Sequence, residues 1–163
     1  MESKMLIAGA LATAALLGTA GAAGASEPPA NAESQFVTGS YSTLMPEGLH
    51  TAISAHNGPN GPSGQVTSRI GDDTAHGRVV CLLVDGNQAN VEVQVTRSTN
   101  PDMGEPGQFA NLSFIDGGPP RFGQPADMVA GIGPHDQPIG CGNSTDYFPF
   151  VLASGNIVVS DGS

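Results

Sequence analysis

Short runs of β-branched and apolar residues, separated by clusters of turn-forming residues, constrain the fold of this chain more than any other feature. The runs occupy residues 36–43, 49–55, 65–70, 77–84, 89–97, 108–115, 127–132, 147–153 and 156–159. Gly, Pro, Asn and Asp gather between them, most densely at residues 57–62. Short apolar runs separated by turn-forming residues are typical of antiparallel all-β domains. We therefore predict a single antiparallel β-barrel or sandwich of about eight or nine short strands.

The clearest local prediction is a hairpin over residues 78–96 that turns at Asp85, Gly86 and Asn87. A two-residue turn, either Asp85-Gly86 or Gly86-Asn87, sets even-numbered residues of the first strand opposite odd-numbered residues of the second. The resulting apolar face is predicted to be core: Val80, Leu82, Val84, Ala89, Val91, Val93 and Val95. A three-residue turn would set this apolar face against polar side chains, which the alternation along a strand penalises.

The opposite face of the hairpin is mixed and carries Cys81, Leu83, Asn90, Glu92 and Gln94. Because Cys81 lies on it, we expect the segment around Cys141 to cross this face and cover Leu83. A buried carboxylate at Glu92 would be a candidate for acid–base chemistry. The polar neighbours of Glu92 at alternate positions favour a solvated face instead.

The first 25 residues have the layout of a signal peptide. Lys4 precedes a small-apolar run over residues 5–17, and further small residues end at Ala25. The run is too short to cross about 30 Å of hydrocarbon as a helix. Cleavage after Ala25 or after Ala22 fits the small-x-small rule, and the residues that follow favour Ala25. We expect a secreted protein without a membrane span: signal peptide 1–25, flexible leader 26–34 and a single β domain 35–163.

The charge balance limits the classes of partner. The chain has 15 acidic and 5 basic residues and a net charge of −10. Nucleic acids and anionic lipid surfaces bind clustered Lys and Arg, so nucleic acid is not expected as a partner. The acidity itself is explained by solubility. An unidentified small molecule, glycan or protein remains as the partner, and the oligomeric state is left open.

The two cysteines, Cys81 and Cys141, are predicted to form a disulfide, which is the default for a lone pair in an oxidising compartment. The alternative is a catalytic or metal-binding thiol. Neither cysteine has a His or a second Cys at ligand spacing, which disfavours that alternative.

Other candidate chemistry is sparse. Asp72, Asp73 and His76 could serve acid–base work or bind a cation, but a polar turn before the strand at residue 77 explains them better. The other histidines are scattered, without the spacing of a metal site: His50, His56 and His135. We predict no metal and no cofactor.

Arg121 and Phe122 stand on a Gly- and Pro-rich loop, residues 117–125. Because loops on rigid β scaffolds often carry function, both are candidate contacts for an anionic or peptide ligand, together with Glu92. An ordinary crossover between sheet edges is the alternative. No serine stands in a GxSxG elbow, so no catalytic residue is predicted.

The stretches GRVVCLLVDGNQANVEVQVTRS (77–98) and GNIVVSDG (155–162) resemble a family of uncharacterised secreted single-domain β proteins of high-GC bacteria. The shared features are a strand with Cys and Leu, a Gly/Asn hairpin and a closing GN(I/F)VV segment. The family's usual ending has His before Asp, whereas this chain has Ser160 before Asp161, so no role of that His is carried over. The resemblance implies an all-β domain and an extracellular location, and no activity.

Three functions fit these observations. The first is a secreted, non-enzymatic β domain that acts as an extracellular binding or envelope-associated module. The alternative is a small secreted enzyme with its active site in a barrel mouth, using groups such as Glu92 or His76. The third is a structural, self-associating envelope component, which an exposed apolar patch would favour.

Overall fold

The structure, a computed structural model, describes residues 35–43, 48–119, 127–142 and 150–162. Its elements are β1 (Phe36–Thr43), β2 (Leu49–Gly58), β3 (Gly61–Ile70), β4 (Asp73–Asp85), β5 (Gln88–Ser98), the 3-10 helix η2 (Pro101–Met103), β6 (Phe109–Ile115), β7 (Met128–His135) and β8 (Phe150–Ser160). Strand β1 coincides with a predicted run. In these ranges no helix is long and apolar enough to cross a bilayer.

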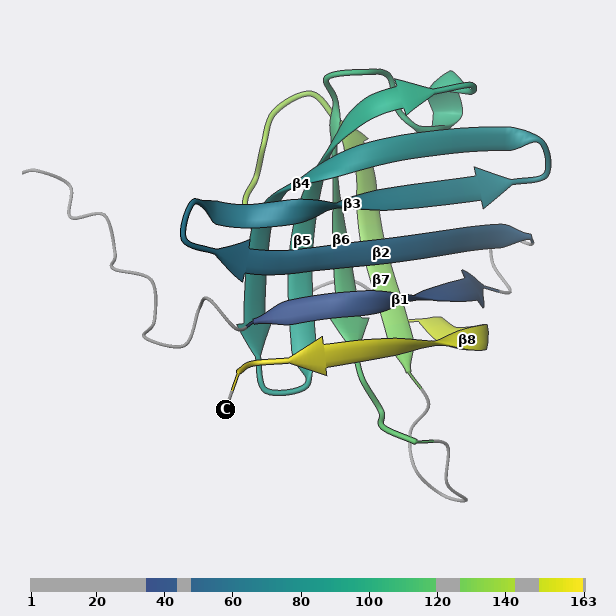
Figure 1. Ribbon diagram of the computed structural model, residues 1–163. Helices are drawn as coiled ribbons and strands as arrows, with labels where there is room; N and C mark the ends of the chain where they lie inside the picture. The colour runs from purple at the N-terminus through teal and green to yellow at the C-terminus, as the bar shows by residue number, and fades with distance from the viewer. Residues whose placement is uncertain (1–34, 44–47, 120–126, 143–149, 163) are drawn as a thin grey trace, which may run out of the picture.

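The strands form one antiparallel sheet that curls on itself. Each strand pairs with the next along the chain, and β8 returns to pair with β1, so the order closes into a barrel. In Figure 1, β8, β1, β2 and β3 lie side by side, and β5, β6 and β7 cross behind them at a steep angle. The all-β prediction is confirmed, as a barrel rather than a sandwich.

Two glycines allow β1 and β8 to approach closely. Gly155 has a φ of 107° and pairs with Tyr41, and a Cβ there would overlap the carbonyl oxygen of Ser40. Gly39 has the reciprocal relation to the carbonyl oxygen of Asn156. Two separate strands, 147–153 and 156–159, were predicted here. The structure has one strand, β8, which continues through Gly155.

The hairpin between β4 and β5 closes on the two-residue turn Gly86-Asn87, as one of the two alternatives predicted. Most of the predicted apolar face is buried: Leu82, Val84, Ala89, Val91, Val93 and Val95. The exception is Val80. A β-bulge leaves Val80 out of the ladder, and Val79 takes the core position opposite Val93. The prediction for Val80 is wrong because the extra residue of a bulge reverses the side-chain alternation.

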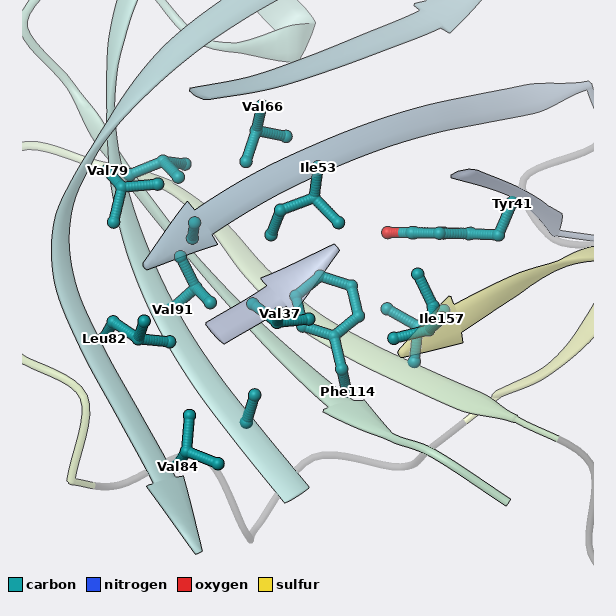
Figure 2. Close-up of a cluster of buried hydrophobic side chains, with 14 residues drawn as sticks. Val37, Tyr41, Ile53, Val66, Val79, Leu82, Val84, Val91, Phe114 and Ile157 are labelled. Atoms are coloured by element: carbon teal, nitrogen blue, oxygen red, sulfur yellow. The ribbon is translucent and has the colours of Figure 1, made fainter. Parts of the chain in front are cut away.

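Apolar side chains fill the barrel interior (Figure 2). The cluster comprises Val37, Tyr41, Ile53, Ala55, Val66, Val79, Leu82, Val84, Ala89, Val91, Val93, Phe114, Val129 and Ile157. The rings of Tyr41 and Phe114 meet edge to face with centroids 6.0 Å apart. Burial raises the pKa of Tyr41 to about 12, although a hydrogen bond with Thr51 opposes the shift.

Carboxylates complete the barrel where strand pairing is short. Strands β7 and β8 share only two residue pairs, Met128 with Val151 and Val129 with Phe150. Farther along β8, the Oδ2 atom of Asp127 accepts the N–H of Ile157 at 2.7 Å. The Oδ2 atom of Asp116 accepts the N–H of Val159 at 3.1 Å. Side-chain acceptors thus satisfy strand amides that lack a partner on β7.

Candidate functional site

The predicted disulfide is present and fixes a segment of chain to the outer wall of the barrel. Cys81 on β4 is bonded to Cys141, with the Cα atoms 5.9 Å apart. The bond tethers residues 136–142, which we call the strap. No free cysteine occurs among the described residues.

The strap buries Glu92. This side chain points outward from β5 but is only 2% exposed, and its Oε1 atom accepts the N–H groups of Ile139 at 2.6 Å and Gly140 at 3.0 Å. The prediction of a solvated face at Glu92 is wrong, because a segment 47 residues away in sequence covers the carboxylate and supplies donors for it. Buried carboxylates are stable only with such donors.

The strap does not cover Leu83, which remains 44% exposed. Strand register explains the error. Cys81 pairs with Glu92, whereas Leu83 pairs with Asn90 in the next outward-facing row. The strap contacts the row that contains its disulfide; in the neighbouring row Asn90 is buried but Leu83 remains exposed.

Two further polar side chains meet Glu92 under the strap. The Nδ2 atom of Asn111 donates to the carbonyl oxygen of Gly140 at 2.7 Å. The Nε2 atom of His135 lies 3.8 Å from Oε1 of Glu92, and neither ring nitrogen of His135 has a hydrogen-bond partner among the described residues. A ligand that reached the Glu92 carboxylate would have to displace the strap. The other two candidate ligand contacts, Arg121 and Phe122, lie outside the described residues.

A more accessible site lies on the outer face of β8, β1, β2 and β3, the four strands that run side by side in Figure 1. It is an open groove of about 300 Å³. Its lining is rich in hydroxyl groups and contains no carboxylate: Ser40, Tyr41, Ser42, His50, Thr51, Ala52, Thr67, Arg69, Ser154 and Gly155. We call it the wall groove.

Strand register builds the wall groove in two rows. Ser40 pairs with Ala52, which pairs with Thr67, and these small side chains form the first row. The second row joins Ser42, His50 and Arg69 in the same way. Residues between these positions, such as Tyr41 and Thr51, are buried.

The polar groups of the second row are held in place. Oγ of Ser42 and Nδ1 of His50 lie 2.6 Å apart. The Nε atom of Arg69 donates to the carbonyl oxygen of Gly71 at 2.8 Å, which orients the guanidinium. The terminal nitrogens of Arg69 meet no carboxylate in the described part of the chain. An oriented, unpaired guanidinium is well suited to bind a carboxylate or a phosphate.

The contact between Ser42 and His50 has the residue types of a nucleophile and a base. In a catalytic triad a third group, usually a carboxylate, orients the imidazole. No carboxylate contacts His50 within the described ranges, so the pair lacks that third member there.

The residues Asp72, Asp73 and His76 do not act as one cluster. Asp73 opens β4 and accepts hydrogen bonds from Thr99 and from Asn100. His76 lies within β4, where its Nδ1 atom is 3.1 Å from Oγ1 of Thr67. The polar turn is therefore shorter than predicted and ends before Asp73. No group of three His, Cys, Asp or Glu side chains in the described ranges is arranged to hold a metal ion.

The wall groove could not be predicted from local sequence patterns, because its strands come from opposite ends of the chain. Strand β8 joins β1 only when the barrel closes. A usable signal was present in the alternating polar residues of 38–42 and 63–69, which indicate polar strand faces.

Comparison with known proteins gives this chain no relative. No family model, no curated protein and no solved structure matches it.

Proposed function

We propose that this protein is a secreted, non-enzymatic binding module whose wall groove takes a small polar ligand carrying a carboxylate. The observation that carries the proposal is the unpaired guanidinium of Arg69. The chain has 15 acidic residues to neutralise 5 basic ones, yet Arg69 meets no carboxylate among the described residues. Its charge is available to an external anion.

The chemistry of the groove supports a hydroxylated ligand such as a sugar acid. Arg69 pairs with the carboxylate through its two terminal nitrogens, a strong and directional contact. The hydroxyls of Ser40, Ser42 and Ser154 exchange hydrogen bonds with ligand hydroxyls. A volume of about 300 Å³ is at the lower end for ligand sites and suits a ligand of roughly one sugar ring.

The alternative, an enzyme with its active site in a barrel mouth, has less support. The cavity at the end of the barrel beside η2 measures about 80 Å³ and is lined mainly by apolar side chains, with His76 at its edge. That volume is far below the range of substrate sites. Glu92, the other group suggested for catalysis, lies on the outer wall under the strap.

Secretion is part of the proposal. It is supported by the signal-peptide layout of residues 1–25, by the resemblance to secreted β proteins of high-GC bacteria, and by the disulfide, which is common in oxidising compartments. Expression in a bacterial host should release a mature protein that begins at Ser26. N-terminal sequencing of the protein recovered from the medium tests this expectation.

The binding function is tested by titrating the mature protein with sodium glucuronate, followed by amide chemical shifts in NMR. We expect shift changes confined to residues of the wall groove, and at least tenfold weaker binding of glucose, which lacks the carboxylate. Arg69→Gln should weaken glucuronate binding at least tenfold. The matched control is Arg78→Gln, an exposed arginine outside the groove. Absence of binding, or equal binding by the Arg69 variant, would contradict the proposal.

A further inference from the structure

The charges of this acidic protein are segregated in the fold. The eight strands contain only three of the 15 acidic residues: Asp73 and Asp85 at the ends of β4, and the buried Glu92. The other acidic residues in the described ranges lie outside the strands: Asp72, Asp102, Glu105, Asp116, Asp127, Asp136 and Asp161. Every arginine among the described residues, by contrast, lies on a strand and is exposed: Arg69, Arg78 and Arg97.

These arginines follow one another across the outer wall. Arg97 on β5 pairs with His76 on β4, which pairs with Thr67 in the first row of the wall groove. Arg69 lies two residues from Thr67 along β3, so it is separated from Arg97 by two strand spacings, about 10 Å across the sheet, and by about 7 Å along the strands. Arg78 lies two residues beyond His76, about 7 Å along β4. We call this group of Arg69, Arg97 and Arg78 the basic track.

None of the three arginines is neutralised within the described ranges. Arg78 donates from Nε and Nη2 to Oε1 of Gln94, a neutral acceptor, and no arginine forms an ion pair. Asp73 stands near the track, but its oxygens are engaged by Thr99 and Asn100. The track thus presents, on a polar face, three positive charges that have no ion-pair partner among the described residues.

We infer that the basic track continues the wall groove as a binding surface for an acidic polysaccharide with one carboxylate on each sugar. This inference rests on the proposed function, in which Arg69 binds a single sugar acid. In the polymer, one sugar occupies the groove and later carboxylates reach Arg97 and Arg78. Hydroxyl and amide side chains between the arginines suit the sugar hydroxyls that separate the carboxylates.

The surface chemistry favours a polysaccharide over a protein or a membrane. Strands β1, β2 and β3 expose no large hydrophobic side chain in their described residues. Protein interfaces have an apolar centre, and membrane-surface binding uses buried apolar side chains. The exposed large hydrophobics are not residues of the groove or the track: Leu83 lies five residues beyond Arg78 on β4, Val158 lies three residues beyond Gly155 on β8, and Ile132 and Ile139 lie on β7 and in the strap.

The net charge of −10 does not prevent this interaction. Charges farther away than about 8 Å are largely screened at physiological ionic strength. A polymer that lies along the track therefore experiences mainly the arginines beside it. At low ionic strength the acidic loops act over longer distances and oppose its approach.

The test compares sodium glucuronate and sodium galacturonate, the monomer of polygalacturonate, with polygalacturonate itself, using the mature protein in about 0.15 M salt. We expect polygalacturonate to bind at least tenfold more tightly, per site, than the monomer. Arg78→Gln with Arg97→Gln should remove this gain and leave monomer binding unchanged. The matched Arg78→Lys with Arg97→Lys variant keeps the charges and should retain most of the gain. Thermal midpoints confirm that both variants are folded.

The outcomes separate the two proposals. If glucuronate binds and polygalacturonate binds no more tightly, or if the double Gln variant retains the gain, the track is refuted and the wall groove stands. If glucuronate does not bind, the proposed function fails and the track fails with it. Binding of dextran sulfate or of vesicles containing anionic lipid, without binding of polygalacturonate, also overturns the inference. Neutral dextran is the control for binding without charge.

Discussion

Asp127 and Ile157 are joined by a hydrogen bond in which the carboxylate of the first accepts the backbone N–H of the second at 2.7 Å. Both residues are buried, and the other oxygen of Asp127 accepts the N–H of Gly117 at 3.0 Å. A side chain thus occupies the place where a neighbouring strand would normally pair with β8. Some of the acidity of this protein is therefore structural.

Asp127→Asn should destabilise the barrel by about 2–3 kcal/mol, because hydrogen bonds to charged groups contribute about that much. The amide group of Asn has only one acceptor, so its NH₂ faces either Ile157 N–H or Gly117 N–H. Urea unfolding of wild type and variant measures the difference. Asp102→Asn, at an exposed position, is the matched control and should change stability by less than about 0.5 kcal/mol. Equal stability of the Asp127 variant and the wild type would disprove a structural role for this carboxylate.

Glu92→Gln should loosen the strap without unfolding the barrel. A neutral amide oxygen accepts the N–H groups of Ile139 and Gly140 more weakly than a carboxylate does. We expect hydrogen exchange of these two amides to accelerate at least tenfold, whereas amides of β2 and β3 remain unchanged. Glu105→Gln, at an exposed position, serves as the control. Unchanged exchange at both amides would show that the disulfide alone holds the strap.

Cys81→Ser with Cys141→Ser should lower the free energy of unfolding by about 4 kcal/mol. The bond joins residues separated by 60 positions, and closing a loop of that length restricts the unfolded chain by about this amount in the chain-entropy model. Reduced wild-type protein should resemble the double variant in urea unfolding. A stability that is insensitive to both reduction and substitution would contradict the expected contribution of the bond.

The stability of the protein should fall between about pH 10 and pH 12 because of Tyr41. Burial raises the pKa of Tyr41 from 10.0 to about 12, so in this range the unfolded chain loses the phenolic proton while the folded chain keeps it. The loss approaches about 3 kcal/mol above the folded pKa. Denaturant unfolding at several pH values measures it. In Tyr41→Phe this component of the pH dependence should disappear, and an identical pH profile would rule out Tyr41 as its source.

The sequence was sufficient to predict features that depend on local patterns or on a choice between few alternatives. Alternation and turn residues predicted an all-β domain and the two-residue turn between β4 and β5. The disulfide could be predicted because two cysteines allow only one pairing. Prediction failed at Val80, because a bulged residue in β4 changes which side chains face inward, and at Leu83, because Leu83 lies in the row next to the one that holds the disulfide.

By itself, then, the sequence determined the fold class, the hairpin and the cysteine pair, since each depends on near neighbours or on elimination. Only the tertiary structure decided that Glu92 is buried under a strap, that Asp127 completes the barrel, and that the arginines line one polar wall. Such relationships join residues far apart in the chain. The pairing of Ser42 on β1 with Ser154 on β8 is another example. Their physical cause is contact between distant segments, through strand pairing, the disulfide and side-chain hydrogen bonds, which no local pattern specifies.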